Sequence, residues 1–269
     1  MQTYILKRVL LFVPTLWLVT LIVFVILRIV PGDPALVSLA GSSGSGFFTE
    51  EQLQAERAKL GTDRPIFVQY GDWLWGMLQL DFGTSIHFGK PVTESLKDRF
   101  PVTLELTVMA LLMAAVVAIP LGVVSAIKQD RLPDYVSRAI TTAGIAFPNF
   151  WIAVLSVYFL VNVFGWAPPL DFADVWEHPV RNLEQLALPA LTLSFTHMAF
   201  ISRVTRSAVL DVLREDYIRT ARSKGLTERV VISRHALRNA LLPVITVAGY
   251  EFTRLIGGTV IIERIFTVP

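Results

Sequence analysis

Residues Val9–Val30 read VLLFVPTLWLVTLIVFVILRIV, a stretch in which Arg28 is the only charged side chain. A helix needs about 20 mostly apolar residues to cross the hydrocarbon core of a bilayer, which is about 30 Å thick. Lys7 and Arg8 precede the stretch, as in a secretory signal peptide, but the apolar part of such a signal is only about 7–15 residues long. The sequence therefore predicts an uncleaved membrane anchor.

Further along the chain, four more apolar segments reach spanning length. They are approximately Val102–Ile127, Tyr135–Phe164, Leu186–Val204 and Leu241–Ile262. Hydrophobic residues make up 53% of the chain and charged residues only 17%, whereas soluble domains carry about 25% charged residues. We therefore expect an all-α, polytopic transmembrane helical bundle with about five spans.

The basic residues predict how these spans are oriented, because short cytoplasmic loops are enriched in Lys and Arg. Lys7 and Arg8 precede the first span, and Lys128 and Arg131 lie between the second and the third. Nine basic residues lie at or between the ends of the fourth and fifth spans: Arg203, Arg206, Arg214, Arg219, Arg222, Lys224, Arg229, Arg234 and Arg238. All three groups fall on one side if every span crosses, which predicts a cytoplasmic N-terminus.

The loop between the third and fourth spans supports this orientation, since it is acidic. It carries Asp171, Asp174, Glu177 and Glu184 against a single Arg181. We expect this loop to lie outside the cell.

Residues 31–100 form a long segment that is predicted to lie outside the cytoplasm. Pro31-Gly32-Asp33-Pro34 ends the first helix, because proline lacks a backbone donor and clashes with the preceding turn. The stretch Gly41–Gly46 is typical of a flexible loop, and Glu50–Leu60 is typical of a short amphipathic helix. Most of the segment is expected to pack on the spans as a small lid. Three aromatic residues are alternatively suited to the membrane interface: Trp73, Trp75 and Phe82.

The chain thus divides into residues 1–30, the N-terminus with the first span; residues 31–100, the extracytoplasmic segment; and residues 101–269, the core. Within the core, the loop 205–240 has the most informative pattern. Its first half reads DYIRTARSKGL over residues 216–226, in which helix-forming residues end at Gly225. A second amphipathic helix is expected beyond this glycine, with Thr227 as its N-cap. Glycine adopts left-handed backbone angles at little cost, so two short helices can be joined there.

A basic projection of this kind has two interpretations. Its arginine and lysine side chains flank apolar anchors, which suits docking into a groove on a soluble partner. The same charges suit contact with anionic lipid headgroups. The pattern of residues leaves both interpretations open.

The loop resembles the coupling motif, the EAA motif, of the permeases of bacterial binding-protein-dependent ABC importers. Gly225 and Leu242-Pro243 match the motif, but its three letters stand here as Arg219-Thr220-Ala221, so only the last alanine is kept. Several other segments also resemble the dipeptide, oligopeptide and nickel group of these permeases, first-subunit type, and they occur in the same order: Pro31-Gly32-Asp33-Pro34, Asp63-Arg64-Pro65, Asp81-Phe82-Gly83, Ile119-Pro120-Leu121-Gly122 and Phe147-Pro148.

The resemblance implies a function. The chain would be a pore-forming permease subunit, not an enzyme, that moves peptides or a related small solute across the bacterial inner membrane. Its partners would be a second permease, two cytoplasmic ABC ATPases and an extracytoplasmic substrate-binding protein, besides membrane lipid and without nucleic acid. ATP and magnesium would bind to the ATPase chains, so this chain would need no cofactor and no metal. The sequence agrees in one respect, because it contains no phosphate-binding loop of the GxxxxGK[ST] type.

The resemblance also implies which residues act. ATP-driven closure of the ATPases would move the helices around Gly225 as a rigid body, which would switch the spans between inward and outward access. The residues expected to couple the permease to the ATPases are Arg219, Thr220, Ala221, Gly225, Leu226, His235, Leu242 and Pro243. Members of the family continue into a sixth, final span beyond the position of Pro269.

The translocation path is predicted from ionisable and polar residues within spans, because these are costly in lipid and usually face protein or water. Glu251 and Arg254 are three residues apart and share one helix face. They would pair with each other and brace helices, or Glu251 would meet a substrate amine. Thr196 and His197 make the fourth span partly polar, which helix–helix hydrogen bonding explains as well as a path does.

Two other classes of function fit the sequence less well. A secondary transporter would typically show repeated halves with interrupted helices at matching positions, and no such repeat is apparent. An intramembrane enzyme would need a nucleophile with a base, or metal ligands, at suitable spacing. The chain has no cysteine, and its four histidines are scattered.

Overall fold

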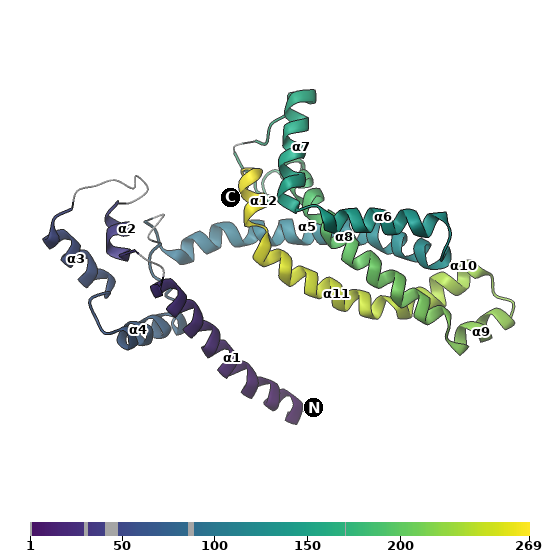
Figure 1. The fold of residues 1–269 in the computed structure, drawn as a ribbon, viewed down its shortest axis with the longest axis horizontal. Coiled ribbons are helices and arrows are strands. Elements are labelled where there is room, and N and C mark those ends of the chain that lie inside the picture. Colours follow the sequence, from purple (N-terminus) through teal and green to yellow (C-terminus); the bar gives the residue numbers. More distant parts are fainter. Residues whose placement is uncertain (1, 30–31, 41–47, 86–88, 170) are drawn as a thin grey trace. The chain divides into compact units, whose positions relative to one another are not determined.

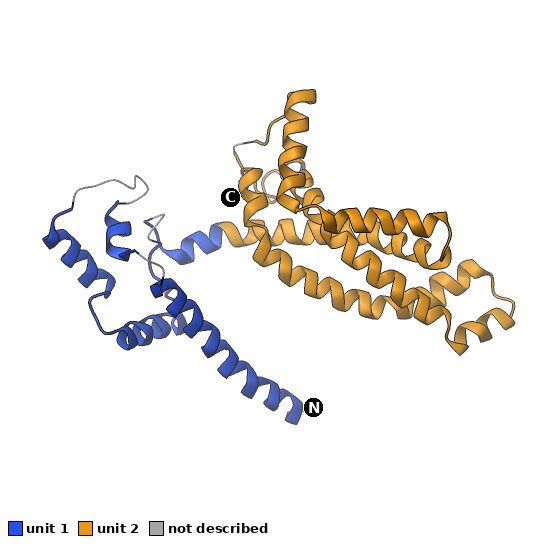
Figure 2. Cartoon of the chain, viewed as in Figure 1, with its two compact units in different colours: residues 1–98 blue, residues 99–269 orange. Residues whose placement is uncertain are grey.

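The computed structural model describes residues 2–29, 32–40, 48–85, 89–169 and 171–269. The described residues are predominantly helical, and a single isolated β-bridge joins Thr84 and Pro91. The chain divides into two compact units, residues 1–98 and residues 99–269 (Figure 2). The predicted all-α class is therefore confirmed. The predicted flexible loop Gly41–Gly46 lies outside the described residues.

The first unit contains helices α1 (Gln2–Ile29), α2 (Pro34–Ala40), α3 (Glu50–Leu60) and α4 (Ile66–Leu78). Phe24 of α1 packs against Tyr70 and Trp73 of α4, with ring centroids 5.3 and 5.8 Å apart. Trp73 therefore packs on the first predicted span, as expected for a lid, while Trp75 is mostly exposed.

Helix α3 has the bounds predicted from the sequence, and the reason is local. Thr49 and Gln52 form a capping box at its start, and Gly61 ends it with a left-handed φ of 65°. Arg57 of this helix donates to Asp33, which lies next to α2, at 2.7 Å. The backbone N–H of Ala35 and the Arg57 guanidinium hold the pKa of Asp33 below its usual value. Asp33 therefore stays ionised and ties α3 to the start of α2.

The second unit is a bundle around one long helix. Its helices are α5 (Val92–Ile127, which begins in the first unit), α6 (Leu132–Ala146), α7 (Asn149–Phe164), α8 (Pro179–Leu213), α9 (Asp216–Ser223), α10 (Glu228–Val230), α11 (Leu237–Gly258) and α12 (Val260–Ile265). A π-helical turn, η2 (Val231–Ala236), joins α10 to α11. Helices α5, α6, α8 and α11 run alongside one another, and α9 and α10 project at one end (Figure 1).

Two glycines let neighbouring helices approach α8 closely. A Cβ atom on Gly122 of α5 would lie 2.6 Å from the carbonyl oxygen of Ser202 and 2.7 Å from the Cβ of Thr205. A Cβ atom on Gly144 of α6 would lie 2.8 Å from the carbonyl oxygen of Phe195. These separations are too short for any larger residue, so both helices contact the backbone of α8 directly.

The span predictions hold in part. Among the described residues, three helices are long and apolar enough to cross a membrane: Thr3–Ile29, Val92–Ile127 and Glu228–Gly258. A bent pair, α6 with α7, raises the number to four if the pair counts as one span. By length and composition, the helices of the structure therefore account for three or four of the five expected spans.

Two of the predicted spans differ from the structure for identifiable reasons. The third, Tyr135–Phe164, is wrong as a single helix, because the chain bends by 95° between α6 and α7. Pro148 causes the break, since it forces Phe147 into an extended conformation (φ −99°, ψ 129°). The fourth, Leu186–Val204, lies inside α8, but α8 is not among the sufficiently apolar helices. Its polar residues Thr192, Ser194 and His197 are buried in protein.

The fifth predicted span, Leu241–Ile262, is also broken near its end. Helix α11 stops at Gly258, and α12 begins separately at Val260. At its start, by contrast, the helix is longer than predicted, since it continues without interruption from Glu228 through η2.

We predict that Gly122→Ala destabilises the bundle. The added Cβ must push α5 away from Ser202 and Thr205, and overpacking of this kind costs about 1–3 kcal/mol of unfolding free energy. Denaturant unfolding of the purified protein in detergent measures the loss. Gly249→Ala in α11 is the matched control, because a Cβ there meets nothing within 4 Å. Equal stability of the two variants would show that the close contact at Gly122 is not required.

Candidate functional site

The predicted coupling segment forms a helical hairpin that ends in a tight turn at Gly225. Gly225 has a φ of +76°, a left-handed conformation that L side chains rarely adopt. Thr227 precedes α10 in an extended conformation, as expected of an N-cap residue, although its side chain makes no capping hydrogen bond. The glycine therefore sets the angle between α9 and the helix that follows.

Four buried side chains anchor the hairpin to the end of α8. Ile218 and Ala221 of α9 pack with Val231 and Ala236 of η2, against Val212 and Leu213. Two polar contacts add to this core. The carboxylate of Glu228 accepts from the Nε atom of Arg222 at 2.7 Å, and the hydroxyl of Tyr217 accepts from the amide of Asn239 at 2.7 Å. The hairpin is thus packed on α8 and continuous with α11.

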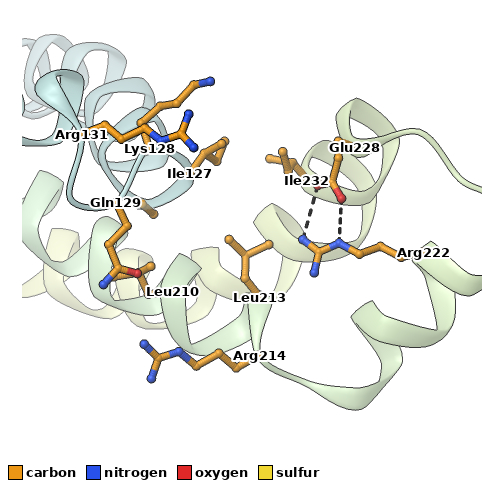
Figure 3. Close-up of a pocket in the computed structure, with 11 residues that line it drawn as sticks. Ile127, Lys128, Gln129, Arg131, Leu210, Leu213, Arg214, Arg222, Glu228 and Ile232 are labelled. Atoms are coloured by element: carbon orange, nitrogen blue, oxygen red, sulfur yellow. Dashed lines mark hydrogen bonds and ion pairs between the residues drawn. The ribbon is translucent and has the colours of Figure 1, made fainter.

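A basic cavity of about 400 Å³ lies between this hairpin and the rest of the bundle (Figure 3). The turn between α5 and α6 supplies Lys128 and Arg131, the end of α8 supplies Arg214, and the hairpin supplies Arg222 and Glu228. Figure 3 shows Arg222 held by two contacts to Glu228. Lys128, Arg131 and Arg214 make no ion pair with any described residue. The cavity therefore carries excess positive charge.

A second cluster lies within the bundle, between α8 and α11. The Nδ1 atom of His197 lies 2.6 Å from the Oε2 atom of Glu251, and both side chains are buried. Arg254, one turn further along α11, lies 3.5 Å from the same carboxylate. Its own side chain is 47% exposed, and its guanidinium stacks over the ring of Phe200. One carboxylate thus holds a histidine inside the bundle and an arginine at its surface.

A third polar contact joins the start of α6 to α8. Asp134 is fully buried, and Arg206 donates to its carboxylate from Nε at 2.9 Å and from a terminal nitrogen at 2.8 Å. The Ser125 hydroxyl and the Asp130 backbone N–H donate to the same group. This two-pronged geometry is the strongest that an arginine and a carboxylate form.

The sequence matches two family models in succession. Residues 1–107 match the N-terminal domain of binding-protein-dependent transport system membrane components. Residues 118–269, more than half of the chain, match the model described as "Binding-protein-dependent transport system inner membrane component". The chain belongs to this family.

Relatives of this permease carry related names. A putative peptide transport system permease protein of Brucella suis biovar 1 is 39% identical over 269 residues, which are 100% of this chain and 84% of the relative. A glutathione transport system permease protein of Salmonella choleraesuis is 38% identical over the same shares. A solved chain titled "Crystal structure of an amino acid ABC transporter with histidines" superimposes with a TM-score of 0.47 at 15% identity, covering 64% of this chain and 73% of that chain.

Membership of the family settles the general role of the chain. It is a non-catalytic, multi-pass permease component of the inner membrane, and it belongs to a transport system that depends on a binding protein and ATPase subunits.

The coupling residues predicted from the sequence fall on two faces of the hairpin. Arg219, Thr220, Gly225 and Leu226 are exposed, and Arg219 pairs only with the exposed Asp216, at 3.2 Å, among the described residues. Ala221 is buried in the small core beneath them.

The remaining members of that predicted set lie elsewhere. His235 is half-buried in η2, whereas Leu242 and Pro243 lie within α11 and are exposed. Leu242 and Pro243 are therefore part of a continuous helix.

The four residues predicted for the translocation path also do not lie together. His197, Glu251 and Arg254 form the cluster between α8 and α11. Thr196 points to a different neighbour, since its hydroxyl donates to the Gly144 carbonyl at 3.0 Å and to the Asn149 side chain at 2.5 Å. It braces α8 against the α6–α7 bend.

Sequence reasoning assigned no role to Asp134, Ser125 or Arg206 as partners. The only signal was an aspartate in the first turn of a helix, where the helix dipole favours a negative charge. Nothing in the sequence connects it to an arginine 72 residues away.

We predict that His197→Ala destabilises the permease more than Glu251→Gln. The first change leaves a buried carboxylate without its short hydrogen bond, which costs about 2–3 kcal/mol, since Arg254 still lies nearby. The second change removes the charge while keeping the size of the side chain. Unfolding of both variants and of the double variant in detergent gives the coupling between them. Equal losses in the two single variants would contradict a charged interaction.

Proposed function

We propose that this chain is one permease subunit of an ATP-driven importer that moves peptides, or a related small solute such as glutathione, across the bacterial inner membrane. The observation that carries this proposal is the 37–39% identity to peptide and glutathione permeases over the whole chain. The complete transporter then contains a second permease, two cytoplasmic ATPases that hold ATP and magnesium, and an external binding protein.

The proposed topology has five crossings, a cytoplasmic N-terminus and the hairpin of α9 and α10 in the cytoplasm. Helix α8 is one of these five crossings, although it is not apolar enough to be recognised as one from its composition. It is able to cross because α5, α6 and α11 cover its polar residues, so that these groups face protein and not lipid. Residues 1–30, 31–100 and 101–269 then serve as anchor, external segment and transport core.

The hairpin is proposed to be the coupling helix that docks on the ATPase. Its exposed tip carries Arg219, Thr220, Gly225 and Leu226, while its other face is packed against α8. A displacement of α9 is therefore transmitted to α8 through Ile218 and, at the same time, to α11 through η2. Because packed helices move as units, the motion of the ATPases is passed into two membrane helices together.

We also propose that α11 contributes to the translocation path. Arg254 presents its charge at the surface of the bundle, whereas Glu251 is buried beneath it and holds it in place. A guanidinium at that position suits the carboxylate groups that peptides and glutathione carry. The earlier alternative, in which Glu251 meets a substrate amine, would require the His197–Glu251 contact to open.

We predict that Gly225→Asp abolishes stimulated ATP hydrolysis without preventing membrane insertion. The new side chain places bulk and negative charge at the tip of the hairpin and strains its left-handed turn. The assembled complex is expected to hydrolyse ATP at the unstimulated rate when substrate and binding protein are added.

Gly165→Asp is the matched control for this variant. Gly165 ends α7 with a φ of 64°, so the substitution imposes similar backbone strain away from the hairpin. Normal stimulation in the Gly225 variant, or equal loss in both variants, would overturn the docking assignment.

We predict that single cysteines will report opposite sides of the membrane. The chain contains no cysteine, so Ser223→Cys in α9 and Glu177→Cys in the acidic loop each introduce one exposed thiol. A membrane-impermeant maleimide added to intact cells is expected to label Cys at 177 and not at 223. Labelling at 223 in intact cells would show that the proposed orientation is inverted.

A further inference from the structure

A second cavity, of about 480 Å³, lies between α5, α6 and α8. Every side chain that lines it is an arginine, a serine or a threonine. The three arginines are Arg138 of α6 and Arg203 and Arg206 of α8, and no carboxylate belongs to the lining. The hydroxyls of Ser125, Ser137 and Thr141 already donate within the protein. The other three hydroxyls and the arginines still offer donors and positive charge, and the lining is therefore suited to an anion.

The positive charge of this cavity is only partly neutralised. Arg206 donates two hydrogen bonds to the carboxylate of Asp134, which neutralises its charge. Arg138 stacks on the ring of Tyr135, and neither it nor Arg203 makes an ion pair with any described residue. Two guanidinium groups are thus available to a ligand.

Three hydroxyl groups of the lining are free to bind a ligand. The hydroxyls of Ser202, Thr142 and Ser207 make no hydrogen bond with the part of the chain that the structure describes. Thr142 and Ser207 are exposed, whereas the residue Ser202 is only 3% exposed. Hydroxyl donors beside guanidinium groups are the donors that a phosphate oxygen requires.

The surroundings indicate where the phosphate comes from. The side of α6 that does not pack on α8 is apolar and exposed, with Leu132, Val136 and Ile140 along it. Arg203 lies where the apolar part of α8 ends. A polar cavity beside a lipid-facing apolar helix is the arrangement of a headgroup site, and basic sites of this kind between membrane helices bind anionic lipids.

We propose that the cavity between α5, α6 and α8 binds the phosphate of an anionic phospholipid, whose acyl chains lie along the exposed face of α6. On the proposed topology, this lipid lies in the cytoplasmic leaflet. Lipid binding does not depend on that topology, because either leaflet can supply the lipid. If the proposed topology proves wrong, the lipid-binding proposal therefore still stands.

The test measures lipids retained by the purified transporter. The assembled complex is placed in nanodiscs that contain phosphatidylcholine with a minor fraction of phosphatidylglycerol, extracted in mild detergent, and examined by native mass spectrometry. Wild-type complex is expected to retain phosphatidylglycerol. Arg203→Gln is expected to reduce that retention about tenfold, because it removes one charge-assisted contact, and Arg203→Lys is expected to restore part of it.

Arg214→Gln is the matched control, since it removes the same charge at the end of the same helix, outside this cavity. Equal retention in the wild type and the Arg203→Gln variant, or equal loss in the Arg203→Gln and Arg214→Gln variants, would overturn the proposal. Arg203 is exposed and makes no hydrogen bond or ion pair with the described residues, so the substitution is not expected to disturb folding.

Two further measurements use wild-type protein. A photoreactive phosphatidylglycerol is expected to crosslink to peptides of α6 and α8, and crosslinks confined to other helices would contradict the site. Inorganic phosphate added to delipidated complex distinguishes the sources of the anion. If phosphate alone protects against heat as well as the lipid does, the ligand is a free phosphate and the lipid assignment is wrong.

Discussion

The burial of α8 is the constraint on which the transport core depends. This helix carries Thr192, Ser194, His197, Ser202 and Thr205, all of which are buried. Such side chains are costly in hydrocarbon, so protein has to cover them. Gly122 and Gly144 allow α5 and α6 to approach the backbone of α8, and Glu251 of α11 meets His197. The surrounding helices are therefore placed by the polar surface that they must cover.

The same helix links two polar contacts of the core and the hairpin. The His197–Glu251 contact lies in its middle, the Asp134–Arg206 contact lies nearer its end, and the hairpin of α9 and α10 packs on its last turn through Val212 and Leu213. In the proposed mechanism, a displacement of the hairpin is transmitted along α8 to both of these side-chain contacts, because the helices between them are packed and hydrogen-bonded. If the hairpin docks on the ATPase as proposed, this arrangement links the docking surface to the proposed translocation path.

The boundaries of the helices show where sequence reasoning succeeds. Helix α3 begins and ends where predicted, because a capping box and a left-handed glycine are local signals. The span Tyr135–Phe164 failed, because hydropathy registers the apolar run and not the 95° bend that Pro148 introduces. A helix was predicted over Leu186–Val204, but α8 extends beyond it at both ends, from Pro179 to Leu213. The burial of its polar face was not predicted, since composition does not reveal which neighbours cover that face.

The sequence by itself determined that the chain lies in a membrane, how its charges are distributed and where the hairpin turns. Each of these depends on residues close together in the chain: the length of an apolar run, the excess of arginine in a loop, a glycine between two helices. The tertiary structure decided which polar groups meet. His197 and Glu251 are 54 residues apart, and Asp134 and Arg206 are 72 apart. Their contacts depend on the rotation and translation of one helix against another, and packing of the whole bundle fixes these.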